Sequence, residues 1–212
     1  MGEEIFSSIV QGLGAGLFIA ATALLNVFSL DKVPSEGKIV YIVLYNCFAC
    51  TMFLNYIFSV LNHALINLTA KEIFKRFTRI FVLLVMEATY LNYTFAAIQG
   101  GAISWTYGIV VTAIATLCVF VSLLLYAIGG SRFEVVNTVI NAVLGWGGLF
   151  ICAHLFHAIT KESFALLIAA GVFYTIGLIF CSLRKIKFMH AIGNLIVLVA
   201  SVYLFFSYFL MF

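Results

Sequence analysis

WTYGIVVTAIATLCVFVSLLLYAI, residues 105–128, contains no charged side chain. An α-helix rises about 1.5 Å per residue, so roughly 20 apolar residues cross the hydrocarbon core of a bilayer. Six further apolar stretches cover residues 9–30, 39–65, 80–99, 135–157, 164–183 and 190–212. The pattern predicts an all-α integral membrane protein: a single domain over residues 1–212, built as a bundle of seven transmembrane helices.

Composition supports a bilayer rather than water as the surrounding medium. Of the 212 residues, 65% are hydrophobic and 9% are charged, and the mean hydropathy is +1.19. Soluble domains contain about a quarter charged residues. The formal net charge of +3 does not indicate nucleic acid, because the basic residues lie in short links between apolar stretches. Membrane lipids are the expected partners, and no pattern specifies an oligomeric state.

Lys and Arg in the links indicate the orientation in the membrane. Eight lie on the side of the amino terminus: Lys71, Lys75, Arg76, Arg79, Arg132, Arg184, Lys185 and Lys187. The opposite side holds Lys32, Lys38 and Lys161. Because basic residues concentrate in cytoplasmic loops, the amino terminus is predicted to be cytoplasmic and the carboxyl terminus external, in the inner cell membrane. No cleavable signal is expected, since the chain opens with Glu3 and Glu4 rather than a basic stretch.

Two histidines lie at the predicted cytoplasmic side. His63 is near the end of the second apolar stretch and His190 at the start of the seventh, each expected about one turn inside its helix. Ser59 is four residues before His63, and Asn194 is four residues after His190. Residues four apart lie on the same face of a helix. Ionisable groups within membrane segments are functional candidates. Two explanations remain open: a metal site, or neutral imidazoles hydrogen-bonded to Ser59, Asn62, Asn194 and backbone groups.

Several motifs occur in a particular order. They are EEIFSSIVQGLGA at 3–15, the Ser59 and His63 pair, Gly145-Trp146, FYTIG at 173–177, Arg184-Lys185 and His190-Ala191-Ile192. Together they resemble the hemolysin III family, the bacterial branch of the superfamily that includes progestin and adiponectin receptors. The resemblance spans the whole chain, and its closest match is the run into the last apolar stretch.

That resemblance implies a zinc ion at the cytoplasmic end. In the family, one histidine of the second helix and two of the seventh, spaced four apart, are thought to hold it, with an aspartate of the third helix acting through water. His63 and His190 match two of the ligands, whereas Asn194 and Thr78 stand where the third histidine and the aspartate are expected. The implied metal ligands are therefore His63, His190 and Asn194, and the implied catalytic residues are Ser59 and Thr78.

The substitutions weaken the chemistry. Catalytic zinc usually has three protein ligands and an activated water. An amide oxygen is a poorer zinc ligand than an imidazole, and Thr78 cannot act as a general base at neutral pH. We therefore expect an incomplete zinc site with little or no hydrolase activity, in a protein whose resemblance implies a role in membrane or lipid homeostasis.

Three other functions remain possible interpretations. The first is a zinc-dependent, ceramidase-like lipid amide hydrolase in which Ser59 orients the water. The second is cytolysis through a membrane pore, as the family name implies. The third is transport of a small solute or of protons along a polar path formed by Glu87 and the helix asparagines Asn46, Asn55, Asn92, Asn137 and Asn141.

Further polar residues lie away from the two histidines. Glu87 is nine residues from Thr78, which places it on the opposite face of the helix and roughly 13 Å further along. It is either a protonated acid bonded to a neighbouring helix or a proton relay or ion-binding group. His154 and His157 are three apart near the predicted external end, where they fit either a headgroup interface or a surface metal site.

Overall fold

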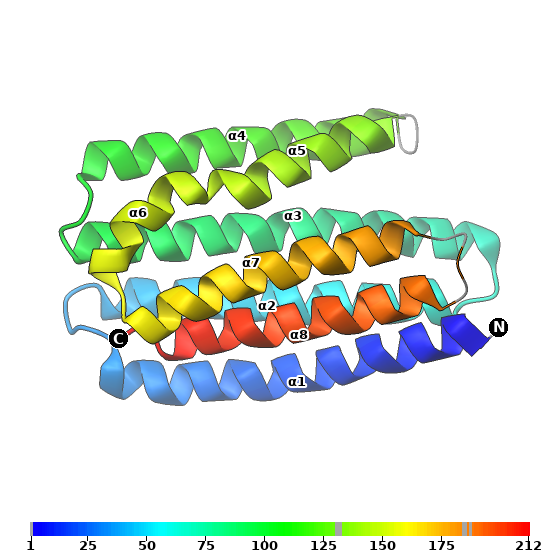
Figure 1. Ribbon diagram of the computed structural model, residues 1–212, viewed down its shortest axis with the longest axis horizontal. Helices are drawn as coiled ribbons and strands as arrows, with labels where there is room; N and C mark the ends of the chain where they lie inside the picture. The colour runs from blue at the N-terminus through cyan, green and yellow to red at the C-terminus, as the bar shows by residue number, and fades with distance from the viewer. Residues whose placement is uncertain (1, 130–132, 184–185, 187) are drawn as a thin grey trace.

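The computed structural model describes residues 2–129, 133–183, 186 and 188–212, and in that part of the chain helices joined by short links are the regular structure, without a strand. Eight helices follow one another: α1 (Gly2–Lys32), α2 (Lys38–Ala64), α3 (Leu68–Gln99), α4 (Trp105–Gly129), α5 (Glu134–Gly147), α6 (Leu149–Ala158), α7 (Lys161–Ser182) and α8 (Met189–Phe209). They run along one long axis, and the two chain ends lie at opposite ends of the bundle (Figure 1). The prediction of an all-α bundle of apolar helices is confirmed.

The fifth apolar stretch differs from its prediction. Among the described helices, six are long and apolar enough to cross a membrane, namely α1 to α4, α7 and α8. Residues 135–157 instead form α5 and α6, which meet at Gly148 and follow one another along the bundle (Figure 1). The Tyr90 hydroxyl of α3 donates to the backbone oxygen of Leu144, at 2.6 Å, just before the break. The prediction of one continuous helix over this stretch is therefore wrong.

The basic segment at 67–79 is helix rather than link. The Asn67 side chain accepts hydrogen bonds from the backbone nitrogens of Thr69 and Ala70, at 2.9 and 3.2 Å, so it caps α3 at Leu68. Glu72 and Arg76, four residues apart, form an ion pair at 3.5 Å along the helix. Charge alone suggested a loop, but the cap and this spacing stabilise a helix. Helix α1 likewise begins earlier than predicted, at Gly2.

Aromatic side chains fill the centre of the bundle. Tyr41, Phe48 and Tyr56 of α2 and Tyr208 of α8 are almost completely buried, and the Phe48 and Tyr208 ring centroids are 4.2 Å apart. Tyr56 donates to the Ser201 hydroxyl of α8 at 2.7 Å. A bilayer offers no water to such a hydroxyl, so a partner on another helix both satisfies it and fixes how the helices pack.

Helices α7 and α8 pack closely through two glycines. A Cβ on Gly193 would lie 2.6 Å from the backbone nitrogen of Cys181, and one on Gly177 would lie 2.7 Å from Cγ2 of Val197. Phe188, with a φ of 64°, turns the chain into α8. The close approach holds the start of α8 against the end of α7, and so positions His190.

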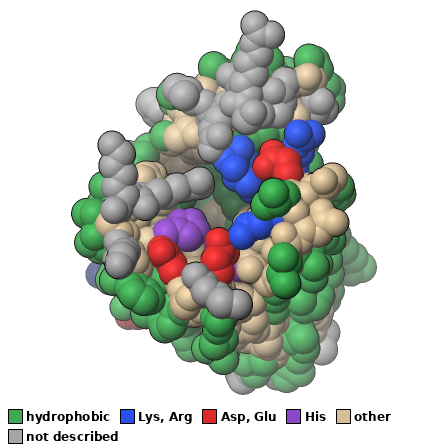
Figure 2. Space-filling view, turned by 90° about the vertical axis from the view of Figure 1, so that its right-hand side faces the viewer, with side chains coloured by type: hydrophobic (Ala, Val, Ile, Leu, Met, Phe, Trp, Pro, Cys, Tyr) green, Lys and Arg blue, Asp and Glu red, His purple; other side chains and the backbone are tan. Residues whose placement is uncertain are grey.

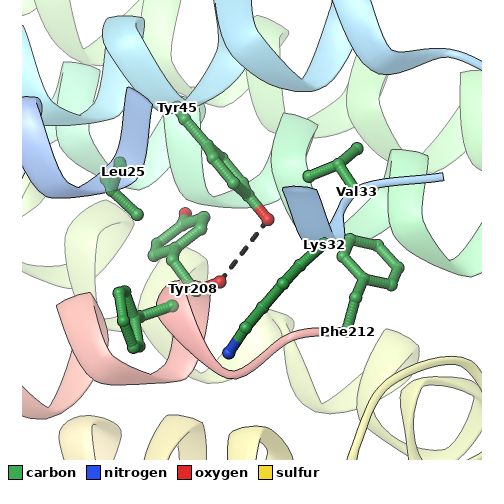
Figure 3. A pocket seen from close by; sticks show the side chains of 7 residues that line it. Leu25, Lys32, Val33, Tyr45, Tyr208 and Phe212 are labelled. Atoms are coloured by element: carbon green, nitrogen blue, oxygen red, sulfur yellow. Dashed lines mark hydrogen bonds between the residues drawn. The ribbon is translucent and has the colours of Figure 1, made fainter. Parts of the chain in front are cut away.

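A small cavity lies where α1 and α8 end (Figure 3). Its volume is about 10 Å³, and Lys32, Tyr45, Tyr208 and Phe212 are among the side chains that line it. The Lys32 ammonium lies 5.2 Å from the Phe209 ring centroid, and the Tyr45 hydroxyl donates to the backbone oxygen of Tyr208. About one water would fill this space, so the cavity is too small for an organic ligand.

Candidate functional site

The two predicted histidines lie together at one end of the bundle. His63 is the last residue but one of α2 and His190 the second residue of α8, so both are closer to the helix ends than predicted. Their ring centroids are 5.5 Å apart, and the ring planes meet at 50°. The end of one helix and the start of the other therefore bring two imidazoles into one place, as their shared side predicts.

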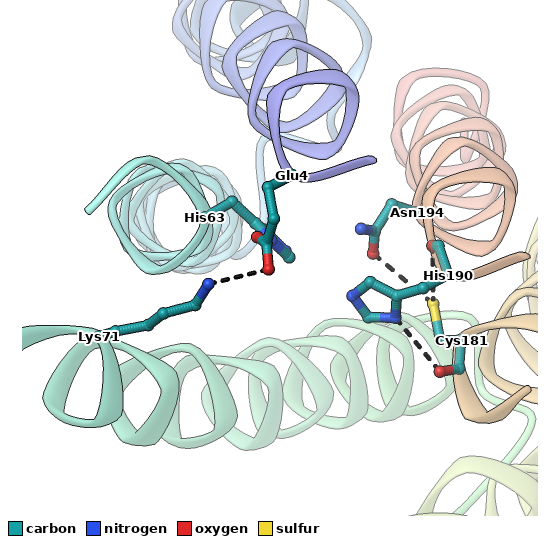
Figure 4. Close-up of polar contacts among 6 residues, drawn as sticks. All are labelled: Glu4, His63, Lys71, Cys181, His190 and Asn194. Atoms are coloured by element: carbon teal, nitrogen blue, oxygen red, sulfur yellow. Dashed lines mark hydrogen bonds and ion pairs between the residues drawn. The ribbon is translucent and has the colours of Figure 1, made fainter. Parts of the chain in front are cut away.

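Glu4 connects this place to α1 and α3 (Figure 4). Its Oε2 lies 2.7 Å from Nδ1 of His63, and its Oε1 accepts a hydrogen bond from Nζ of Lys71 at 2.9 Å. The His63 side chain is 8% exposed and that of Glu4 is 45% exposed. A carboxylate only accepts, so Nδ1 of His63 carries the proton. In the neutral ring, Nε2 is then left with a free lone pair.

His190 is held in the same manner by a backbone group. Its Nδ1 lies 3.2 Å from the carbonyl oxygen of Cys181, at the end of α7. Because a carbonyl oxygen only accepts, this Nδ1 also carries a proton, and Nε2 remains free in the neutral ring. The His190 ring extends from α8 toward Glu4 and His63 (Figure 4).

Asn194 lies one turn after His190 and is buried. Its Oδ1 accepts a hydrogen bond from the Cys181 thiol at 3.6 Å, while its Nδ2 is buried without a partner among the described residues. An unsatisfied buried donor costs about 1–3 kcal/mol. A half-turn of the amide would exchange its two ends and place the oxygen, a metal ligand, where Nδ2 now lies.

The two residues predicted as catalytic, Ser59 and Thr78, lie on different helices. Ser59 is buried on α2, one turn before His63. The Thr78 hydroxyl donates to the backbone oxygen of Phe74 in its own helix at 3.0 Å, so its proton is already used within α3. Gln11 is another buried polar residue, on α1.

The donor set can be compared with what zinc requires. Across the described ranges there is no group of three His, Cys, Asp or Glu side chains placed to hold a metal ion. Two imidazoles whose Nδ1 protons are held by a carboxylate and a carbonyl are typical of metal-ligating histidines. The donors present are these two imidazoles and the amide of Asn194, whose oxygen faces the Cys181 thiol. They do not fit a shell of three histidines with an acid acting through water.

Sequence reasoning missed Glu4, Lys71 and the carbonyl of Cys181. Glu4 and Lys71 lie in segments that the predicted topology places at the histidine end, so an acid near a buried histidine was a usable signal. The Cys181 carbonyl leaves no such signal, because every residue type has one.

Charged groups surround the site (Figure 2). In this end view, basic, acidic and histidine side chains border a central hollow, and hydrophobic side chains cover the outer wall. The Arg79 guanidinium lies 5.7 Å from the Tyr126 ring centroid. Four of the eight basic residues used to predict the orientation lie outside the described residues: Arg132, Arg184, Lys185 and Lys187.

The remaining candidates lie elsewhere. Oε1 of Glu87 is 2.6 Å from the Thr116 hydroxyl of α4, so the Glu87 carboxyl contacts that helix. His154 and His157 are both exposed on α6. The His154 ring packs against Tyr107, with centroids 5.7 Å apart, and the His157 ring against Phe156, at 5.5 Å.

Comparison with known proteins is consistent with this architecture. The family model described as "Haemolysin-III related" matches residues 1–205. Hemolysin-3 of Bacillus cereus is 28% identical over 204 residues, which cover 96% of this chain and 89% of that protein. A hemolysin-3 homolog of Bacillus subtilis (strain 168) is 27% identical over 204 residues, covering 96% and 92%.

Proposed function

This chain belongs to the hemolysin III family of multi-pass cell-membrane proteins, and we propose that it acts in membrane or lipid homeostasis through an incomplete zinc site. In this proposal α5 and α6 together make one of seven crossings, the amino terminus is cytoplasmic and the carboxyl terminus is external. Lys71, Lys75, Arg76 and Arg79 support that orientation, because they lie in the first turns of α3 at the histidine end.

The observation that carries the proposal is the pair of oriented imidazoles. Nδ1 of His63 is bound to Glu4 and Nδ1 of His190 to the Cys181 carbonyl, so both Nε2 atoms are available. His63 and His190 would hold the ion, and the Asn194 amide would complete the protein ligands. Zinc bound there would act as a Lewis acid on a water or carbonyl oxygen.

The same geometry supports a low rate of hydrolysis. The Glu4 carboxylate already contacts both Lys71 and His63. Thr78, in the position of the family's aspartate, offers a hydroxyl that is not a base at neutral pH. An amide third ligand lowers the affinity for zinc relative to imidazole. We therefore expect a site that binds zinc weakly and turns over lipid amides slowly or not at all.

Zinc content tests the proposal directly. Elemental mass spectrometry would measure zinc per chain in the purified protein and in the double variant His63→Ala, His190→Ala, after equilibration at graded free zinc. The matched control is His154→Ala, His157→Ala, which also removes two imidazoles. Weak zinc binding lost only in the first variant supports the site. Equal binding in all three proteins would overturn it, and tight stoichiometric zinc would favour the lipid amide hydrolase.

The printed names of the two relatives support a second candidate, cytolysis. Release of a trapped dye from liposomes that contain the purified protein would test it. Dye release that scales with protein and is absent from protein-free liposomes would support a pore. Intact liposomes would leave the homeostasis role as the better proposal.

A further inference from the structure

Glu87 lies deep within a membrane-spanning helix. It is twelve residues before the end of α3 at Gln99, about 18 Å along the helix axis. The neighbouring α4 contains no Lys, Arg, His, Asp or Glu. A charged carboxylate at this depth needs a partner of opposite charge or a route to water, and α4 supplies no such charge.

The hydrogen bonds around Thr116 indicate the state of the acid. The Thr116 hydroxyl lies 2.6 Å from Oε1 of Glu87 and 2.8 Å from the backbone oxygen of Thr112. A hydroxyl has one proton, and the Thr112 carbonyl has none. Thr116 either shares its proton between the two oxygens, or donates to Thr112 and accepts from a protonated Glu87. Only in the second arrangement does each contact have a proton of its own, and there the Glu87 carboxyl is neutral.

The second carboxyl oxygen leads to the same conclusion. Oε2 of Glu87 is buried and has no hydrogen-bond partner among the described residues. Half of a negative charge on such an oxygen would be uncompensated, whereas the carbonyl oxygen of a neutral acid is far less costly to leave unpaired.

A groove on the outer surface lies next to this acid. It has a volume of about 490 Å³ and runs along α3 and α4, with Leu91, Thr112, Thr116 and Phe120 among the lining residues. Phe120 is 56% exposed. Thr116 lines the groove and its hydroxyl contacts Oε1 of Glu87, which is itself not a lining residue. The groove is open to the surroundings and lies along α3 and α4, both long and apolar enough to cross a membrane.

We propose that Glu87 is a neutral carboxylic acid that forms a proton-binding site between α3 and α4, open to modification by apolar carbodiimides from the lipid. The reaction is balanced without another reactant. The acid proton moves to one nitrogen of dicyclohexylcarbodiimide, and the carboxyl oxygen bonds to its central carbon. The acyl group then shifts to the nitrogen and leaves a stable N-acylurea that keeps every atom of the reagent. The proposal is independent of the zinc site.

Two measurements at neutral pH on the protein in lipid nanodiscs test the proposal. Infrared difference spectra between wild type and Glu87→Gln should show a protonated-carboxyl stretch above the amide I band, present only in the wild type. In Thr116→Val this band should shift, because the acid loses its acceptor. Dicyclohexylcarbodiimide should add its whole mass to the peptide that contains Glu87, and not in Glu87→Gln.

The control reagent is a water-soluble carbodiimide used with an amine nucleophile. It should modify the exposed Glu36 and leave Glu87 unmodified. Thermal unfolding of each variant checks that the fold is retained. Absence of the infrared band in folded wild type would overturn the neutral acid. A band without carbodiimide addition would overturn the access from lipid.

Discussion

At the candidate site, the Glu4 carboxylate holds His63 through Nδ1 and thereby orients its free nitrogen. Removing a carboxylate that orients a metal-ligating histidine typically lowers metal affinity about 10–100-fold. We therefore expect Glu4→Gln to raise the dissociation constant for zinc by about that factor, as measured by competition with a chelator of known affinity. Glu3→Gln, one residue earlier on the same helix, is the control and should change little. Equal losses in both variants would mean a general charge effect.

Asn194 stands where the family resemblance implies the third histidine ligand. Replacing it by histidine places two imidazoles four residues apart on one face of α8, beside His63. Three imidazoles form a common shell for zinc, so Asn194→His should strengthen zinc binding by about tenfold or more, equivalent to roughly 1.4 kcal/mol. The control, Asn62→His, adds an imidazole next to His63 but on another helix face. A similar gain in both variants would contradict the assignment of Asn194.

The sequence could identify two of the groups at this site, but not the contacts that orient them. His63 and His190 were predictable, because histidine is rare in apolar helices and their helix ends share one side. Glu4 is 59 residues from His63 along the chain, and no periodicity relates the two. The Cys181 carbonyl is a backbone atom, so only the close packing of α7 on α8 reveals its role.

Among the helices, α7 and α8 pack so closely that one methyl group should disturb them. A Cβ on Gly193 would lie 2.6 Å from the Cys181 backbone nitrogen and 2.8 Å from the Gly177 oxygen. Gly193→Ala should lower the free energy of unfolding by about 1–3 kcal/mol, measured as thermal stability in detergent. Gly171→Ala, in α7 with nothing within 4 Å of its Cβ position, should be neutral or stabilising. Equal stability of the two variants would contradict the close packing.

A side chain from another helix is hydrogen-bonded next to the break between α5 and α6. The Tyr90 hydroxyl donates to the Leu144 carbonyl at 2.6 Å, so Tyr90→Phe leaves that carbonyl without this donor. The expected cost is about 1–2 kcal/mol of unfolding free energy. Tyr107→Phe, which removes a hydroxyl with no described hydrogen bond, is the control. If both variants unfold at the wild-type temperature, the Tyr90 contact does not stabilise the break.

Hydropathy predicted where the apolar helices lie, but not this break. Gly145, Gly147 and Gly148 suit close helix contact as well as a helix end, because small residues serve both purposes in membranes. Tyr90, which contacts this place, belongs to a distant segment of the chain. The prediction for the start of α3 was wrong for the opposite reason. Asn67 is a local capping signal, but the charged residues that follow it were interpreted as a loop.

For the whole molecule, we predict the orientation in the membrane from where basic residues accumulate. The link between α1 and α2 contains Ser35, at the end opposite to His63 and His190, and Lys75 lies in α3 near the histidine end. With all five native cysteines replaced, a single cysteine at Ser35 should react with a membrane-impermeant maleimide in intact cells. One at Lys75 should react only in inside-out vesicles. The reversed pattern would invert the proposed topology and place the histidines outside. Reaction of both cysteines from the same side would mean that α2 does not cross the bilayer, because these positions flank that single helix.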